Sequence, residues 1–299
     1  MRFEIEHDTR YQYSAPVALG PQTVRLRPRP DGAVRELEWT LTLNPKPQVR
    51  SDQLDAEGNL VTRLWFLGET RHLDIGVRLR AETSRPNAFD FVPDLGAHRL
   101  PMDYAPAEAA ALALYRPQGA PDVALRALVA QIEAVSDGSP TGFLVALNQW
   151  IYTQIEREIR DQGTAQSAAQ TLRSRRGACR DQTVLFVAAA RAVGLAARFV
   201  SGYQDKSAME TDRRYLHAWP EVYLPGGGWR GFDPTRGIAV ADGHVPVAAS
   251  TTSAGAAPVE GSYQGSARSE MGFRLSILAE PNPGLPEHPD PSTDNQIAP

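Results

Sequence analysis

Apolar and polar residues alternate through most of the first 92 residues, and this period of two limits what the chain can fold into. The alternation begins at the N-terminus, where Phe3, Ile5 and His7 are separated by charged residues. It returns in runs near residues 24–26, 37–43 and 73–79. Such runs are typical of strands with one buried face and one wet face. Because proline and glycine turns separate them, we predict an N-terminal antiparallel β-sandwich-like domain over residues 1–92.

The apolar spacing changes to that of helices after about residue 94. We predict helices over residues 122–135, 141–155 and 179–193. Asp122 is placed to cap the first of these. Ser167 followed by Gln170 is a capping-box pattern that opens another short helix, which we expect Gly177 to end. The chain is therefore expected to be α+β, with its helices after its first strands.

The C-terminal part of the sequence returns to strand patterns. We predict a strand over residues 196–203, a hairpin with strands 216–224 and 229–235, and a last strand over 271–278. Residues 248–270 are small and polar, so we expect a long loop there. The expected organisation is a core at 93–245 with a helical lead-in, an extension at 246–280 and a disordered, proline-rich tail at 281–299.

The overall charge and cysteine content exclude several classes of protein. The net charge of −4 gives no support for a nucleic-acid or membrane partner, and no apolar run is long enough to span a bilayer. The N-terminus lacks an apolar signal core, so we expect a cytoplasmic protein. A single cysteine excludes an internal disulfide framework and a cysteine-rich zinc site. We expect no metal and no cofactor.

The single cysteine, Cys179, lies at the predicted start of an apolar helix. Free N–H groups and the helix dipole at such a position favour an anion and lower a cysteine pKa. The same N–H groups could stabilise an oxyanion on an attacked carbonyl. Asp181, in the first turn, opposes a thiolate but suits the dipole. The alternative is a buried structural cysteine, since free cysteines are often buried.

His217 and Asp233 lie on the two strands of the predicted hairpin. A carboxylate held against the imidazole would fix its tautomer and stabilise the imidazolium, as in other catalytic triads. The alternatives are an ordinary strand histidine and an ordinary turn aspartate. An even-numbered loop would turn Asp233 away from His217, so their contact requires an odd-numbered loop or a β-bulge. We predict one of these two.

The remaining candidates have simpler explanations. His7, His72, His98, His244 and His288 show no metal-ligand spacing, and we expect structural or surface roles for them. Trp150 and Gln166 could line a cleft or supply an oxyanion donor. We favour core packing for Trp150 and helix entry for Gln166.

Four strings in order, GACRD, RFVSGY, HAWPEVYLPGGGW and GFDPT, resemble the core of the bacterial transglutaminase-like superfamily. HDTRYQYSAPV, RLRPRP and DAEGN resemble the β-rich domain that often precedes it, so the resemblance covers residues 1–245. It implies a papain-like or transglutaminase-like core of helices packed on an antiparallel sheet. It further implies Cys179 as nucleophile, His217 as general base and acid, and Asp233 as the orienting carboxylate.

The implied reaction is acyl transfer from a peptide or side-chain amide through a thioester on Cys179. Water as the second reactant gives a peptidase or amidase, and an amine gives cross-linking or amide formation. The same triad serves both, and we favour hydrolysis because few sites exclude water well. The expected partner is a peptide or protein substrate. The alternative from another class is a non-catalytic peptide-binding module whose working part is the β domain.

Overall fold

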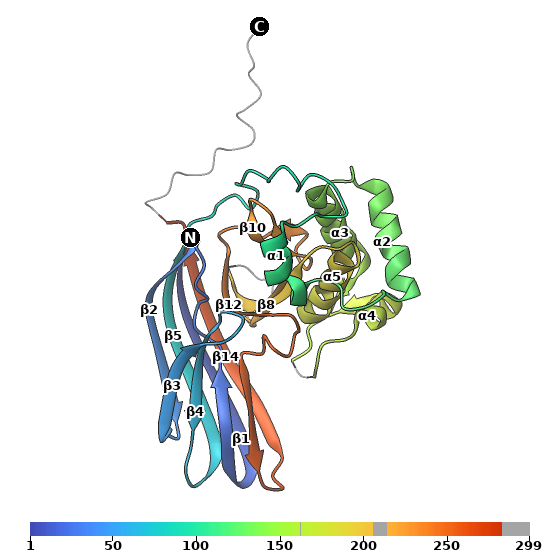
Figure 1. Ribbon diagram of the computed structural model, residues 1–299. Coiled ribbons are helices and arrows are strands. Elements are labelled where there is room, and N and C mark those ends of the chain that lie inside the picture. The colour runs from blue at the N-terminus through green and yellow to red at the C-terminus, as the bar shows by residue number, and fades with distance from the viewer. Residues whose placement is uncertain (162, 206–213, 283–299) are drawn as a thin grey trace.

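The computed structural model describes residues 1–161, 163–205 and 214–282. A long β domain stands beside a part in which helices cover a smaller sheet (Figure 1). The mixed α+β architecture predicted from the sequence is confirmed. Most of the tail predicted to be disordered lies outside the described residues. No helix in the described ranges is long and apolar enough to cross a membrane.

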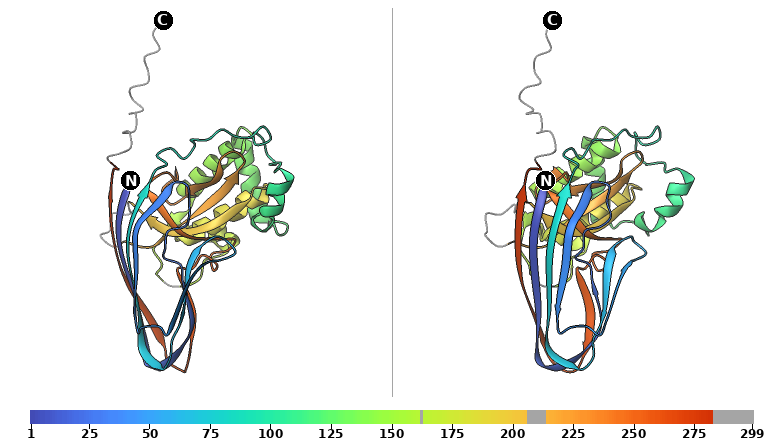
Figure 2. Two further views of the ribbon diagram at one scale, coloured as in Figure 1. Left: turned by 60° about the vertical axis from the view of Figure 1, so that its left-hand side comes forward. Right: turned by 90° about the vertical axis from the view of Figure 1, so that its left-hand side faces the viewer.

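The β domain is one antiparallel sheet of seven strands. They are β1 (Arg2–Val24), β2 (Val34–Asn44), β3 (Val49–Leu54), β4 (Leu60–Trp65), β5 (Glu69–Thr83), β13 (Val259–Gln264) and β14 (Ser269–Glu280). The long β1 pairs with β5 and β14 along its first half and with β4 and β13 near its end. The sheet therefore bends into two layers that meet at the end far from the helices (Figure 2). Alternate side chains of β1, such as Phe3 and Ile5, are buried in the hydrophobic core of the β domain.

The second part of the molecule contains the helices. They are α1 (Pro106–Ala111), η1 (Ala113–Tyr115), α2 (Val123–Val135), α3 (Pro140–Gln154), α4 (Ala168–Ser174) and α5 (Cys179–Ala192). The predicted caps are present: Asp122 accepts the Leu125 N–H at 2.8 Å, and Ser167 and Gln170 form the capping box. Helix α5 is buried along most of its length because it packs against both the other helices and the sheet.

The sheet of this part has the strand order β11-β10-β9-β8-β12. Its strands are β8 (Ala197–Gln204), β9 (His217–Leu224), β10 (Gly228–Asp233), β11 (Ile238–Ala239) and β12 (His244–Ser250), and a short pair is formed by β6 (Glu156–Arg157) and β7 (Arg176–Gly177). Phe186 of α5 stacks on Phe232 of β10 with ring centroids 5.4 Å apart. This contact packs the middle of α5 against the β9–β10 hairpin.

The prediction of a long loop over residues 248–270 is wrong. Strand β12 continues to Ser250, β13 covers Val259–Gln264 and β14 begins at Ser269, so strands interrupt the segment. Neither β12 nor β13 shows the alternation that predicts a strand. Every residue of β12 is buried, whereas most of β13 is exposed and is held by its pairing with β1. The predicted C-terminal extension thus returns to complete the first sheet.

The prediction that Gly177 ends α4 is also wrong. The helix stops at Ser174, and Arg175 takes the left-handed conformation with φ 54°. Its guanidinium lies over the ring of Trp150 at 4.8 Å. Gly177 instead permits a close approach, because a Cβ there would lie 2.9 Å from the Cβ of Asp181 in the first turn of α5.

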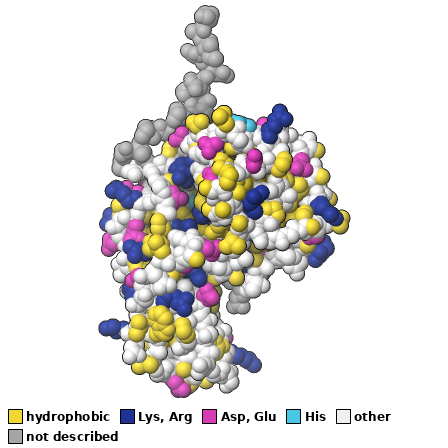
Figure 3. All heavy atoms as spheres, viewed as in Figure 1, with side chains coloured by type: hydrophobic (Ala, Val, Ile, Leu, Met, Phe, Trp, Pro, Cys, Tyr) yellow, Lys and Arg dark blue, Asp and Glu magenta, His cyan; other side chains and the backbone are white. Residues whose placement is uncertain are grey.

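Both signs of charge are mixed over the face seen in Figure 3, with arginine and carboxylate side chains interspersed on the β domain and the helical part. This mixing agrees with the small net charge of −4.

Candidate active site

Cys179 is the first residue of α5, as the sequence predicted, and its side chain is partly exposed. The preceding Ala178 is extended, and its N–H donates to the Asp181 carboxylate at 2.8 Å. This bond holds the entry of the helix in place. The N–H groups of a first helical turn have no acceptor within the helix, so the Cys179 amide is available beside its own sulfur.

The β9–β10 hairpin has the odd-numbered loop that the contact between His217 and Asp233 requires. Leu224 pairs with Gly228, which leaves a loop of three residues, 225–227. Pro225 and Gly226 form its turn, with Gly226 at φ 80° and the Gly227 N–H donating to the Leu224 carbonyl at 2.8 Å. Continued along the hairpin, this register puts Asp233 on the same face as His217. The prediction of either an odd-numbered loop or a β-bulge is confirmed, with the loop as the alternative that is present.

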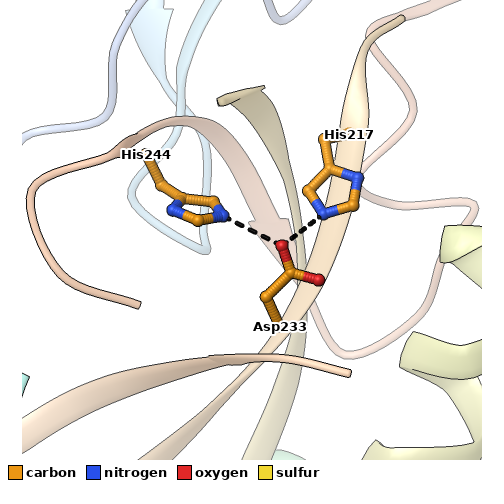
Figure 4. A group of neighbouring side chains, drawn as sticks. All are labelled: His217, Asp233 and His244. Atoms are coloured by element: carbon orange, nitrogen blue, oxygen red, sulfur yellow. Dashed lines mark hydrogen bonds and ion pairs between the residues drawn. The ribbon is translucent and has the colours of Figure 1, made fainter. Parts of the chain in front are cut away.

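Asp233 is fully buried and is the centre of the hydrogen-bond network. Its Oδ2 accepts from Nε2 of His217 at 2.9 Å and from Nε2 of His244 at 3.2 Å (Figure 4). Its Oδ1 accepts from the backbone N–H of Thr235 at 3.0 Å and from the Thr235 hydroxyl at 2.7 Å. Four donors thus hold this carboxylate in one orientation.

The His217 ring lies beside the Cys179 sulfur, since each group is a cause of the other's pKa shift through charge and hydrogen bonding. Because Nε2 of His217 is engaged with Asp233, the ring nitrogen that meets the sulfur is Nδ1. The structure therefore brings the three predicted residues together in the order sulfur, imidazole, carboxylate.

A cleft of about 790 Å³ opens beside Cys179 and His217. Its lining includes Phe199 and Ser201 of β8 and the segment 253–258 that follows β12. Strands β1 and β14 of the β domain also contribute side chains. The candidate nucleophile therefore faces a cavity to which both parts of the molecule contribute.

Comparison with known proteins agrees with this fold. The bacterial transglutaminase-like N-terminal region matches residues 3–82, and the transglutaminase-like superfamily core matches residues 126–234. The chain belongs to the transglutaminase-like superfamily. Its core family match spans the start of α5 and the hairpin up to the residue after Asp233, and so includes all three predicted site residues.

Relatives of this transglutaminase-like chain include mycobacterial proteins that are named only as uncharacterized. A Mycobacterium tuberculosis protein (strain ATCC 25618 / H37Rv) is 26% identical over 284 residues, covering 87% of each chain. A Mycobacterium leprae protein is 26% identical over 142 residues, which are 46% of this chain and half of that protein.

Among solved structures, "a Putative Cysteine Protease from Cytophaga hutchinsonii" superposes with a TM-score of 0.71 at 22% identity, covering 94% of this chain and 92% of that one. This similarity shows that the two share the fold. Superfamily membership, fold and site geometry together support cysteine-based catalysis in general.

The electrostatics of the transglutaminase-like site favour a charged pair. Burial raises the pKa of the Cys179 thiol, but the hydrogen bond and positive charge of His217 outweigh it, so the pKa lies below its ordinary 9.0. Burial lowers the pKa of His217, but the charge and hydrogen bond of Asp233, with a contribution from Cys179, raise it from 6.5 to about 9. Both shifts act in the direction of a thiolate beside an imidazolium.

Asp233 supplies the negative charge that supports this pair. Burial raises the pKa of its carboxyl group, but the charge and hydrogen bond of His217 and the hydrogen bond of His244 bring it well below 3.8. Burial lowers the pKa of His244 despite its bond to Asp233. His244 is therefore neutral near pH 7 and donates its Nε2–H.

Asp181, the other carboxylate near the sulfur, is fully buried and completely engaged. Its Oδ1 accepts from Arg160 at 2.8 Å and from the Gln166 N–H at 2.7 Å, while Oδ2 accepts from Ala178. The Arg160 charge compensates the carboxylate, which reduces its opposition to a thiolate. The charge of Arg157, which the sequence analysis overlooked, also lowers the pKa of Cys179.

Trp150 and Gln166 do not line the cleft. Trp150 packs against the helical core beneath Arg175, and the backbone of Gln166 supports Asp181. Among the described residues they have the roles that the sequence analysis favoured.

His244 is the site residue that sequence reasoning missed. It was expected to be structural or surface, and the structure places it, buried, against Asp233. Within the described ranges, His217, Asp233 and His244 are also the one group whose ligand atoms lie close enough for a metal ion, within 4.8 Å of one another. Both Nε2 atoms already donate to the same carboxylate oxygen, so the group functions as a hydrogen-bond network.

Proposed function

We propose that this protein is a cysteine-dependent acyl-transfer enzyme that acts on an amide of a peptide or protein. The observation that carries the proposal is the chain of contacts from the Cys179 sulfur to the His217 ring and on to Asp233 at 2.9 Å. Cys179 is the nucleophile, His217 the general base and acid, and Asp233 the residue that fixes the tautomer of His217.

The reaction begins when the Cys179 thiolate attacks the amide carbonyl carbon. The C–S bond forms as the carbonyl π electrons move to oxygen, and the Cys179 N–H at the helix start donates to that oxyanion. The intermediate collapses as the C–N bond breaks, and Nδ1–H of the His217 imidazolium gives its proton to the leaving amine. The product of this half-reaction is a thioester on Cys179.

In the second half-reaction, neutral His217 removes a proton from the incoming nucleophile, which attacks the thioester and releases the thiolate. With water the enzyme is a peptidase or amidase; with a primary amine it forms a new amide. We favour water, because the Cys179 side chain is partly exposed and the cleft beside it is large enough to admit solvent.

The experiment is incubation with a glutamine-containing peptide, with and without a primary amine, followed by mass spectrometry. Hydrolysis gives a shortened or deamidated peptide in both reactions, and transamidation gives an amine adduct. Cys179→Ser is the control and is expected to form neither. Absence of every product, together with iodoacetamide labelling of Cys179 no faster than that of glutathione at about pH 6, would favour the non-catalytic binding module.

A further inference from the structure

The cleft beside Cys179 has one wall that comes from outside the catalytic core. Strand β1 contributes Thr9 and Tyr11, and β14 contributes Met271, Phe273 and Ile277. Thr9 pairs with Phe273 and Tyr11 with Met271. Because alternate residues of a strand point to the same side, these odd-numbered residues form a single face of two hydrogen-bonded strands.

This wall is apolar and uncharged. Its largest members are Tyr11, Met271, Phe273 and Ile277. The one titratable imidazole in it, His7, is buried and already bonded: Nδ1 lies 3.1 Å from the Tyr203 hydroxyl and Nε2 lies 3.3 Å from Thr9 Oγ1. Burial lowers the pKa of His7 to about 4, so it carries no charge near neutral pH.

The facing side of the cleft is also largely apolar, with Phe199, Leu216 and Pro258 among its residues. Charged side chains also line the cleft: Glu158 pairs with Arg160 at 3.0 Å and Glu260 with Arg25 at 3.1 Å, and Arg157, Asp161, Arg180 and Arg214 lie in the same lining. The β1–β14 face and the side opposite it are largely apolar, so this part of the cavity of about 790 Å³ suits a ligand that buries a large apolar group.

We propose that the β1–β14 face is the acyl-donor binding site and that it selects donors with a large apolar side chain beside the attacked carbonyl. This inference rests on the proposed function, because it places the reacting carbonyl at Cys179. The β domain would then determine substrate preference while the core performs the chemistry. A hydrophobic pocket of this kind discriminates between large and small side chains by about 10–200-fold.

The test uses three small esters and no assumption about the natural substrate. Acylation of Cys179 is measured as the release of 4-nitrophenol from three substrates. These are the 4-nitrophenyl esters of N-acetyl-leucine and N-acetyl-serine, and 4-nitrophenyl acetate. The leucine ester is expected to acylate at least about 10-fold faster than the serine ester after correction for spontaneous hydrolysis. Acetate has no side chain and reports the nucleophile alone.

The matched variants lie on adjacent residues of β14. Ile277 is on the cleft face, whereas Leu278 is on the opposite face and is 54% exposed. Ile277→Thr is expected to lower the leucine-to-serine ratio several-fold, and Leu278→Thr to leave it unchanged. Met271→Thr is a second cleft-face variant at a side chain that is 37% exposed, so it is expected to fold even if Ile277→Thr does not.

The outcomes separate the two proposals. If 4-nitrophenyl acetate acylates Cys179 but the leucine and serine esters acylate it at equal rates, the apolar donor site is refuted and the proposed function stands. The same holds if the cleft-face variants keep the wild-type ratio. If the wild-type protein releases 4-nitrophenol from 4-nitrophenyl acetate no faster than Cys179→Ser does, both proposals are refuted.

Discussion

Replacing Asp233 by asparagine removes the charge that supports the pair while keeping the size and hydrogen-bonding capacity of the side chain. The pKa of His217 stands at about 9 against an ordinary 6.5, and Asp233 is the largest cause that raises it. At 1.36 kcal/mol per unit, this difference corresponds to roughly 3 kcal/mol of preference for the imidazolium. Without the carboxylate, burial leaves His217 neutral at pH 7, and the Cys179 thiol loses the cation that lowers its pKa.

The expected size of the effect follows from the thiolate population. A thiol with a pKa at or above the ordinary 9.0 is about 1% ionised at pH 7, whereas a cysteine at a helix N-terminus or beside a protonated histidine typically has a pKa of about 3.5–7.5. The pKa of Cys179 is shifted in that direction. Asp233→Asn should therefore slow alkylation of Cys179 by iodoacetamide about 100-fold at pH 7. Loss of the His217 proton near pH 9 leaves the thiolate in place, so the wild-type rate should not fall there.

The assay is the alkylation rate measured from pH 5 to 10 by mass spectrometry of the intact protein. Asp74→Asn is the matched control, because Asp74 is a paired carboxylate of the β domain, bonded to Arg10 at 2.6 Å. It should leave the profile unchanged. An Asp233→Asn protein that folds and is alkylated within about threefold of the wild-type rate at pH 7 would refute the ion-pair reasoning.

Three further outcomes are expected. His244→Leu removes one donor from the buried Asp233 carboxylate and should cost about 1.5–3 kcal/mol in urea unfolding, with His244→Gln recovering part of the loss. Asp181→Ala leaves the N–H groups of Ala178 and Gln166 without their acceptor, while Arg160 keeps Glu158, and should cost about 1–3 kcal/mol in the same assay. An unchanged midpoint would contradict the assigned bonds. The pKa of Asp233 is depressed in the folded protein, so the contribution of this carboxylate to stability is present above pH 3.8 and is lost as the pH falls below that value. Asp233→Asn should therefore lose less stability than the wild type when the pH is lowered from 5 to 3.

Local signals in the sequence were sufficient for much of the fold. The Asp122 cap and the Ser167–Gln170 capping box depend on residues within one helical turn, and the structure contains both. The start of α5 at Cys179 was predictable for the same reason. The contact between His217 and Asp233 depends on strand alternation and loop length, so an odd-numbered loop or a β-bulge was predictable, and the structure has the odd loop.

The features that the sequence did not predict depend on distant parts of the chain. The strand character of β13 comes from pairing with β1, more than 230 residues away in sequence, and most of its own side chains are exposed. His244 reaches Asp233 because β12 pairs with β8 and brings it beside the hairpin. No spacing in the sequence reports this, since tertiary pairing decides it. Arg175 rather than Gly177 ends α4. Gly177 has a different role, because a side chain at that position would collide with Asp181.

Strand β12 connects the β domain to the chemistry. His244, at its first residue, bonds to Asp233, and Ala249, near its end, exchanges two hydrogen bonds with Asn59 of the β3–β4 turn: Asn59 accepts the Ala249 N–H at 2.8 Å and donates to its carbonyl at 3.0 Å. The side chain of Arg29 also bonds to Asn59, and its own backbone N–H donates to the Pro246 carbonyl at 2.9 Å. The β domain thus holds in place the strand that supports the candidate orienting carboxylate, and β14 supplies a wall of the cleft. A core cut away from this domain would lose both, so the two parts should be treated as one functional unit.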